Sequence, residues 1–230
     1  MKRGFGNAST PSASPAKPRS KPLKRPSQAR AIFTVEAIYE AFVRIWLREG
    51  WTSLTTRAVA LEAGVAIGTL YDYFPSKEAM LSGYVRYGIE CLLARLDREV
   101  VQPTDLSWQA RVERLLEVCC NPPEPDRSMF GYELIQLEYK IAERKHQARA
   151  YEELASKWRE VFAACHDLPH QPAAQIIDAW LTSVWGGRRY YLTAQLSAEQ
   201  QRVWLAEMKG MLVQRVGQAS NCDPAKSIQN

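Results

Sequence analysis

Apolar residues recur with a helical period from about residue 30 onward. Ile38, Ala41, Phe42 and Ile45 stand at positions i, i+3, i+4 and i+7, which predicts one apolar stripe along a helix that Gly50 ends. The later segments show the same period, and no segment alternates in the way that is typical of a strand. We therefore predict an all-α fold with about nine helices.

Two short helices are expected directly after the first one. Thr55 is placed to cap a helix that Gly64 ends, and a second short helix is expected over residues 67–73. Two short helices joined by a tight glycine turn are typical of a helix-turn-helix. Residues 30–80 are therefore predicted to form a three-helix DNA-binding module.

The rest of the chain is predicted to form a larger helical domain over residues 81–218. Ser197 and Gln200 predict a capping box at the start of its last helix, and the sequence NPPEPD at 121–126 predicts a break. The helical pattern covers residues 76–98, 106–120, 128–139, 143–165, 172–194 and 197–212.

The N-terminal segment 1–29 differs from the rest in composition. It contains five prolines among Ser, Ala and basic residues, which predicts a disordered, partly polyproline-II arm. Residues 219–230 are predicted to be a disordered tail. Residues 1–30 carry eight basic residues and no acidic one, so the remaining 200 residues have a net charge of −3.

This charge distribution affects how the predicted module could bind DNA. Residues 31–80 contain four basic and six acidic residues, and phosphate neutralisation dominates non-specific affinity for DNA. One hypothesis is that the arm supplies the electrostatic attraction, through the minor groove for example. The alternative is that it is a solubilising tail.

Several functional classes are not expected from the composition. The five cysteines form no C-x-x-C pair, so reduced and mostly buried cysteines are expected rather than a metal site or disulfides. No apolar stretch approaches the ~20 residues of a membrane span, and the N-terminus lacks the apolar region of a secretory signal or the regular face of a transit peptide. We expect a cytoplasmic protein with no membrane partner, no cofactor and, since no catalytic constellation is present, no enzymatic activity.

One segment resembles a known family. The sequence TTRAVALEAGVAIGTLYDYFPSKEAML, preceded by the Gly50–Trp51 pair, is similar to the DNA-binding module of the tetracycline-repressor-like (TetR) family of bacterial regulators. The resemblance covers about residues 31–85. It implies a homodimer that binds double-stranded DNA, with a divergent C-terminal helical domain that binds a small molecule and dimerises through its last two helices.

Candidate DNA contacts follow from this resemblance and from side-chain chemistry. Hydroxyl groups and basic residues suit phosphate oxygens, Ile67 suits a thymine methyl, and small residues allow close approach. Ala66 departs from the family pattern, which has a capping Ser or Thr there. Packing roles for the two tyrosines and a solvated charge for Arg57 remain as alternatives. The predicted contacts are Thr55, Arg57, Ile67, Gly68, Thr69, Tyr71, Tyr73 and Lys77.

The second domain is rich in aromatic residues at helical spacing, which is typical of a core. The resemblance implies that some of them line a cavity for a small apolar or aromatic effector, with Tyr132, Glu133 or Arg188 to orient it. The candidate pocket residues are Phe130, Tyr132, Leu134, Leu137, Trp158, Phe162, Trp180, Trp185 and Arg188.

The pair Gly186–Gly187 lies inside a predicted helix, where glycine is unfavourable. Close approach of another helix would compensate, so a dimer interface is expected through residues 176–192 and 199–215. The chain is thus predicted to be a homodimeric repressor released from a palindromic operator by an effector. The alternative is a constitutive or architectural DNA-binding protein, and the sequence leaves open the effector, the operator, the regulated genes, and whether the protein represses or activates.

Overall fold

The computed structural model describes residue 22 and residues 29–121, 132–141 and 143–218, and within these ranges the chain is helical without a strand. The predicted arm, apart from Pro22 and Ala29, lies outside the described residues, and so does the whole predicted tail, residues 219–230. None of the described helices is long and apolar enough to cross a membrane. The elements are α1 (Ala29–Ser53), α2 (Thr56–Glu62), α3 (Ile67–Tyr73), α4 (Lys77–Leu96), the π-helical turn η1 (Asp97–Val101), α5 (Trp108–Cys120), α6 (Tyr132–Ile141), α7 (Arg144–Ala163), α8 (Ala174–Thr193) and α9 (Ala198–Gly217).

The front module consists of α1, α2 and α3. Residues at the helix ends define its two short helices, α2 and α3. The Thr55 hydroxyl accepts a hydrogen bond from the Ala58 amide at 3.2 Å and so begins α2. Gly64, with a φ of 67°, allows the tight turn into α3. Ala66 gives α3 no side-chain cap, as the sequence indicated. A helix of seven residues is not stable by itself, so α3 depends on tertiary packing.

That packing is supplied by a core formed from α1, α2, α3 and the start of α4. Phe42 of α1, Leu70 of α3 and Phe74 after it are almost completely buried in it. Each such side chain contributes about 1.5–3 kcal/mol through removal of apolar surface from water. The buried face of α3 therefore fixes the orientation of this helix. The opposite face is exposed and remains available for contacts with another molecule.

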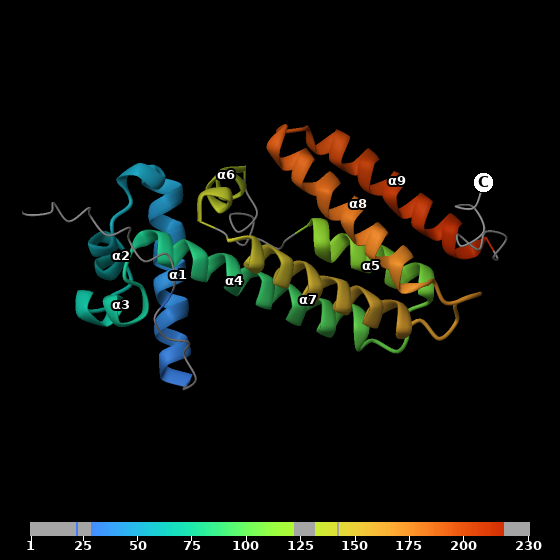
Figure 1. The fold of residues 1–230 in the computed structure, drawn as a ribbon, viewed down its shortest axis with the longest axis horizontal. Coiled ribbons are helices and arrows are strands. Elements are labelled where there is room, and N and C mark those ends of the chain that lie inside the picture. Colours follow the sequence, from blue (N-terminus) through green and yellow to red (C-terminus); the bar gives the residue numbers. More distant parts are fainter. Residues whose placement is uncertain (1–21, 23–28, 122–131, 142, 219–230) are drawn as a thin grey trace, which may run out of the picture.

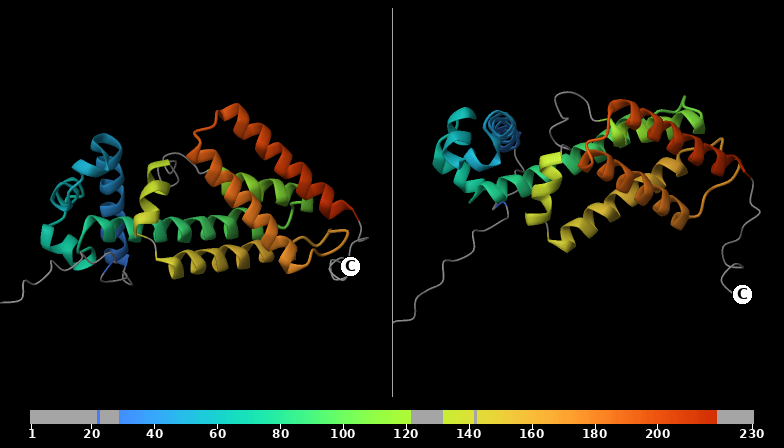
Figure 2. Two further views of the ribbon diagram at one scale, coloured as in Figure 1. Left: turned by 45° about the horizontal axis from the view of Figure 1, so that its top comes forward. Right: turned by 90° about the horizontal axis from the view of Figure 1, so that it is seen from above.

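A second core holds the body together. It is formed by the C-terminal half of α4 with α5, α7, α8 and α9, and Trp158 and Phe162 of α7 are fully buried at its centre. In Figures 1 and 2 the molecule is elongated, with the front module at one end and α8 and α9 side by side in the body. The helix α4 runs from the module into the body, so it belongs to both cores.

The short helix α6 also joins the two regions. Its Leu134 and Leu137 side chains belong to the core of the front module. On the same helix, Glu138 forms an ion pair with Arg189 of α8, with 3.3 Å between Oε2 and Nη1. A displacement of α6 would therefore alter contacts of both the module and the body.

Gly187 of α8 has a packing partner within the same chain. A Cβ atom at this position would lie 2.7 Å from the Trp204 ring of α9, so glycine is needed for the two helices to approach. The neighbouring Gly186 faces open space, with no atom within 4 Å of its Cβ position. The expected close approach of a helix is thus present at Gly187, but α9 of the same protomer makes it.

Buried polar groups hold the connection between α4 and α5. Arg111 of α5 is buried and donates hydrogen bonds to the carbonyl groups of Val101 at 3.0 Å and Pro103 at 2.7 Å. The Asp167 carboxylate accepts a hydrogen bond from the Trp108 amide at 3.1 Å and so caps α5 from a distant segment. Neither contact has a local sequence signal.

Candidate nucleic-acid interface and ligand cavity

The outward face of α3 presents small, apolar and hydroxyl-bearing side chains. Ile67 and Tyr71 are 40% and 46% exposed, and Thr69 is half-buried. Gly68 is exposed, and no heavy atom lies within 4 Å of the position where a Cβ atom would stand. Packing within the chain therefore does not require glycine at this position, whereas close approach of an external surface would.

The two tyrosines of α3 lie differently. The Tyr71 hydroxyl is 3.0 Å from the Thr56 hydroxyl of α2, so the pair joins the two helices at the surface. The Tyr73 ring is half-buried and packs beside Phe74, with 6.3 Å between ring centroids. Tyr71 is thus the tyrosine better placed to meet a ligand, while Tyr73 also serves the core of the module.

The basic residues of the front module are mostly engaged within the protein. Arg44 and Arg48 of α1 both pair with Glu62 of α2, at 3.1 Å and 3.4 Å. Arg44 also pairs with Glu40, and Arg48 with Glu49. The two arginines hold the pKa of Glu62 below its usual value, mainly through the hydrogen bond from Arg44. Arg57 is exposed and forms neither a hydrogen bond nor an ion pair with any residue that the structure describes.

Lys77 lies at the first position of α4, and its side chain turns back toward the end of α1. The ammonium group donates to the carbonyl oxygens of Trp51 at 2.9 Å and Leu54 at 3.3 Å. It also lies 4.8 Å from the centroid of the Trp51 ring. Two of its three donors are therefore used to hold α1 against α4, which leaves one donor for a phosphate oxygen.

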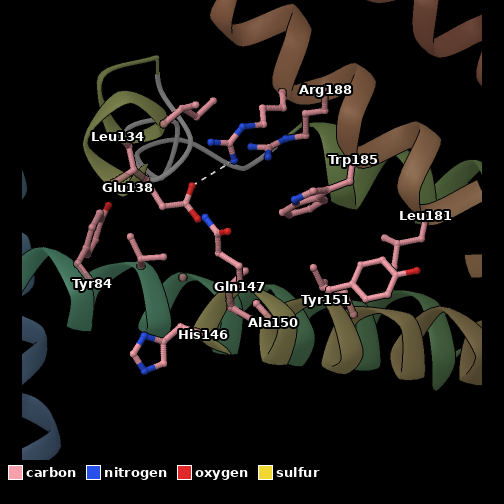
Figure 3. Close-up of a pocket in the computed structure, with 16 residues that line it drawn as sticks. Tyr84, Leu134, Glu138, His146, Gln147, Ala150, Tyr151, Leu181, Trp185 and Arg188 are labelled. Atoms are coloured by element: carbon pink, nitrogen blue, oxygen red, sulfur yellow. Dashed lines mark hydrogen bonds and ion pairs between the residues drawn. The ribbon is translucent and has the colours of Figure 1, made fainter. Parts of the chain in front are cut away.

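A cavity of about 340 Å³ lies between α4, α6, α7 and α8 (Figure 3). This volume is at the lower end of the range of small-molecule sites. Most of its wall is apolar, and Tyr84 of α4 and Leu134 of α6 belong both to this wall and to the core of the front module. The apolar part includes Tyr84, Ile89, Leu134, Leu154, Leu181 and Trp185.

Charged groups gather where α6 faces α8. Arg188 is only 6% exposed, and burial lowers the pKa of its guanidinium group. Its Cζ atom lies 5.0 Å from the centroid of the Trp185 ring. Figure 3 shows Glu138 and Arg188 pointing into the same space, with the ion pair of Glu138 and Arg189 drawn there. The cavity thus combines an apolar wall with two arginines and one carboxylate.

Three of the nine candidate pocket residues line this cavity, namely Leu134, Trp185 and Arg188. The others lie elsewhere: Leu137 is in the core of the module, Trp158 and Phe162 are in the core of the body, and Trp180 packs on Phe162 at 5.3 Å between centroids. Tyr132 begins α6 without a described side chain, and Phe130 lies outside the described residues.

Sequence reasoning missed the wall residues Glu138, His146, Gln147 and Arg189. The only available signal for Glu138 was its spacing of four residues from Leu134, which places both on one side of α6. For Arg189 it was adjacency to Arg188. Neither signal identifies the helix on the opposite side.

The front geometry defines a class of protein. Two short helices are joined by a tight turn, and the second has one buried and one exposed face, which is the arrangement of a helix-turn-helix DNA-binding module. Residues 38–83 match the family model described as "Bacterial regulatory proteins, tetR family".

Sequence similarity to named DNA-binding proteins supports this match. The chain is 28% identical over 115 residues to the nucleoid occlusion factor SlmA of Vibrio vulnificus (strain YJ016), a region that is 49% of this chain and 58% of SlmA. It is 41% identical over 61 residues to the HTH-type transcriptional repressor KstR of Mycolicibacterium smegmatis, 26% of this chain and 30% of KstR. The chain therefore matches a little more than half the length of SlmA and less than a third of the length of KstR.

The fold is shared over a longer range. A TetR transcription regulator from Haloarcula marismortui superposes with a TM-score of 0.59 and 18% identity, covering 80% of this chain and 96% of that one. Residues 38–83 thus form a DNA-binding module of the TetR type, and the chain shares the all-helical fold of this structure.

Proposed function

We propose that the protein is a sequence-specific DNA-binding transcriptional regulator, a homodimeric repressor that a small molecule releases from its operator. The observation that carries this proposal is the course of α4. This helix begins four residues after the end of α3 and contributes Tyr84 to the cavity wall. From Lys77 to Tyr84 the rise along the helix is only about 10 Å, so a ligand in the cavity acts close to the DNA-binding surface.

In this proposal α3 is the recognition helix in the major groove. Ile67, Gly68 and Thr69 are at its N-terminal end and approach the base edges, as in other helix-turn-helix proteins. Tyr71 and Arg57 contact phosphate oxygens, because their polar groups are exposed beside that end. Thr55, Tyr73 and Lys77 are also engaged within the protein, so each adds a contact only at the edge of the interface.

The proposed dimer is formed through α8 and α9, over residues 176–192 and 199–215. Large apolar side chains remain exposed on these helices: Tyr190 is 69%, Val203 60% and Met211 51% exposed. Exposed apolar groups on neighbouring helices are typical of an interaction surface. A two-fold dimer would present two copies of α3 to a palindromic site.

The relatives and the cavity support an effector-controlled repressor more than a constitutive or architectural DNA-binding protein. KstR is named a transcriptional repressor. A purely architectural role would give no reason for a cavity that is bounded by α4 and α6, both of which reach the core of the front module.

The substitution Gly68→Leu tests the DNA-binding surface. Because the space at Gly68 is open, a leucine fits the free protein and leaves the thermal melting temperature unchanged or higher. It should nevertheless reduce affinity for genomic fragments selected by the wild-type protein at least tenfold, measured by fluorescence anisotropy. The matched control is Gly217→Leu, at an equally open position near the end of α9. Equal affinities of G68L and wild type would refute α3 as the recognition helix.

A further inference from the structure

Pro22 of the N-terminal arm has a contact partner on α4. Its Cγ atom lies 3.0 Å from the position where a Cβ atom of Gly83 would stand, so the proline ring packs directly against the backbone of this helix. Pro22 is half-buried and Gly83 is buried. A proline in a fully solvated segment would be exposed, so the arm contacts the folded part of the chain at this point.

Aromatic side chains surround this contact, where α1 crosses the first half of α4 (Figure 1). The Tyr39 hydroxyl and the Phe74 ring also approach the Cβ position of Gly83, the ring at 3.0 Å. The Tyr39 ring is held in place by Phe74 and Tyr87, with 5.4 Å and 5.3 Å between ring centroids. A side chain at position 83 would fill the space beside Pro22, so the absence of one keeps this surface open to the proline ring.

We propose that Tyr39, Phe74 and Gly83 form a docking site for the proline-rich arm of the same chain, and that Pro22 is the residue that binds there. Proline-rich segments bind to grooves lined by aromatic side chains, because their extended and rigid backbone loses little entropy on binding. The arm has the composition of such a segment, with five prolines in residues 1–29.

The length of the connection suits an occupant from the same chain. Ala29 begins α1, and Tyr39 lies about 15 Å further along this helix. The seven residues from Pro22 to Ala29 reach about 25 Å when extended, so they span this distance without strain. Because the arm is attached so close to the site, its docking is an intramolecular step with a high effective concentration, and a weak contact is sufficient.

Docking keeps basic residues close to the surface that is proposed to bind DNA. Phe74 directly follows α3, and the distance along this helix from Ile67 to Phe74 is only about 10 Å. Residues within three positions of Pro22 remain at most about 11 Å from the docking site. Four of them are basic, namely Arg19, Lys21, Lys24 and Arg25. The docked arm therefore supplies positive charge beside α3. This consequence rests on the proposed function, whereas the docking itself does not.

Proteolysis of the arm tests the docking without DNA. A protease specific for arginine can cut after Arg3 and Arg19, but the bond before Pro26 resists it. The cut after Arg19 requires the segment that contains Pro22 to leave the module. We expect it to be roughly fivefold or more slower in the full-length protein than in a synthetic peptide of residues 1–28, when followed by mass spectrometry. The cut after Arg3 should be equally fast in both.

The variant Pro22→Ser removes the docked ring and keeps every charge of the arm. Pro15→Ser is the matched control, because it makes the same change seven residues away. In P22S the cut after Arg19 should become as fast as in a peptide with the same substitution, whereas P15S should keep the protection. Equal rates in the wild-type protein and its peptide, or protection that persists in P22S, would overturn the docking site.

DNA binding then tests the contribution of the docked arm. P22S should bind a random duplex several-fold more weakly than P15S and the wild type, because the undocked arm must be ordered when it meets DNA. The slope of log K against log salt concentration should stay the same, since no charge is lost. Unchanged affinity in a P22S protein that has lost its protection would refute this contribution. Protection at Arg19 in a protein that binds no DNA would refute the proposed function and leave the docking site assigned.

Discussion

The front module and the body use their positive charges in opposite ways. On the module, Arg44 and Arg48 form ion pairs with Glu40, Glu49 and Glu62, and Lys77 is directed toward backbone carbonyl groups. In the body, Arg188 is buried in the wall of a cavity. The surface proposed to meet a polyanion thus has most of its described basic side chains engaged within the protein, whereas the body places an arginine in the wall of a cavity.

This difference shows that non-specific attraction of DNA and recognition of a particular partner depend on different side chains. Charges exposed to water attract any phosphate backbone and are screened by salt, so they contribute little to sequence preference. The outward face of α3 offers a methyl-bearing side chain, a glycine and hydroxyl groups, which suit shape and hydrogen-bond recognition. The guanidinium group of Arg188, in contrast, is buried, where electrostatic interactions are screened less than at the surface.

The largest effect is expected from removal of a core side chain. Trp158→Ala should lower the free energy of unfolding by about 3–5 kcal/mol, because Trp158 is fully buried in the body. Phe42→Ala in the front core is the matched variant. Since α4 belongs to both cores, each variant should unfold in one transition when urea denaturation is followed by circular dichroism. Two separate transitions in W158A would show that module and body are independent.

The next effect concerns the basic N-terminal arm. Deletion of residues 2–25 removes seven basic residues and no acidic one. It should weaken DNA binding and reduce the slope of log K against log salt concentration by several units. A random duplex suffices for this measurement, because the term does not depend on sequence. An unchanged slope would mean that the arm is a solubilising tail.

A smaller effect is expected from single arginines of the module. Arg57→Ala should reduce the same salt slope by about one unit, as expected for the loss of one phosphate contact. Arg44→Ala is the control, since Arg44 is paired with Glu62 and should leave the slope nearly unchanged. Equal salt slopes for R57A and R44A would contradict the proposal that Arg57, rather than Arg44, contacts a phosphate.

The smallest effect tests the helix starts of both regions. Ala66 before α3 and Ala173 before α8 occupy capping positions with extended backbone and no side-chain hydrogen bond. Ala66→Ser and Ala173→Ser should each raise the free energy of unfolding by about 1 kcal/mol, measured from denaturation midpoints. Thr55→Ala, which removes an existing cap, should lower it by a similar amount. A loss of stability in A66S would mean that close packing, rather than a missing cap, determines the residue there.

The sequence predicted the front module well because its signals are local. The cap at Thr55, the turn at Gly64 and the bounds of α3 all depend on residues within one or two helical turns. The capping box of Ser197 and Gln200 was predicted for the same reason and is confirmed. A window of about ten consecutive residues is therefore enough to predict a helix cap, a glycine turn or the bounds of a short helix.

The cavity could not be predicted in the same way. Periodicity identifies the buried face of a helix, but it does not tell whether a neighbouring helix fills the space beside that face. Trp158 and Trp185 both lie on apolar faces, yet the first is in the core and the second lines the cavity. The pair of Glu138 and Arg189 joins positions 51 residues apart, and the direction of the Lys77 side chain depends on carbonyl groups at the end of α1.

The contact of Gly187 with Trp204 has a consequence for the DNA that the proposed dimer can recognise. The backbone of α8 at Gly187 packs directly against the indole ring of Trp204 of α9, with no room for a Cβ atom. The small size of Gly187 therefore fixes how the two helices cross. If two protomers meet through these helices, the same crossing fixes the distance between their recognition helices. The number of base pairs between the two halves of an operator would then be set by the absence of a side chain at one half-buried position of α8, far from any base.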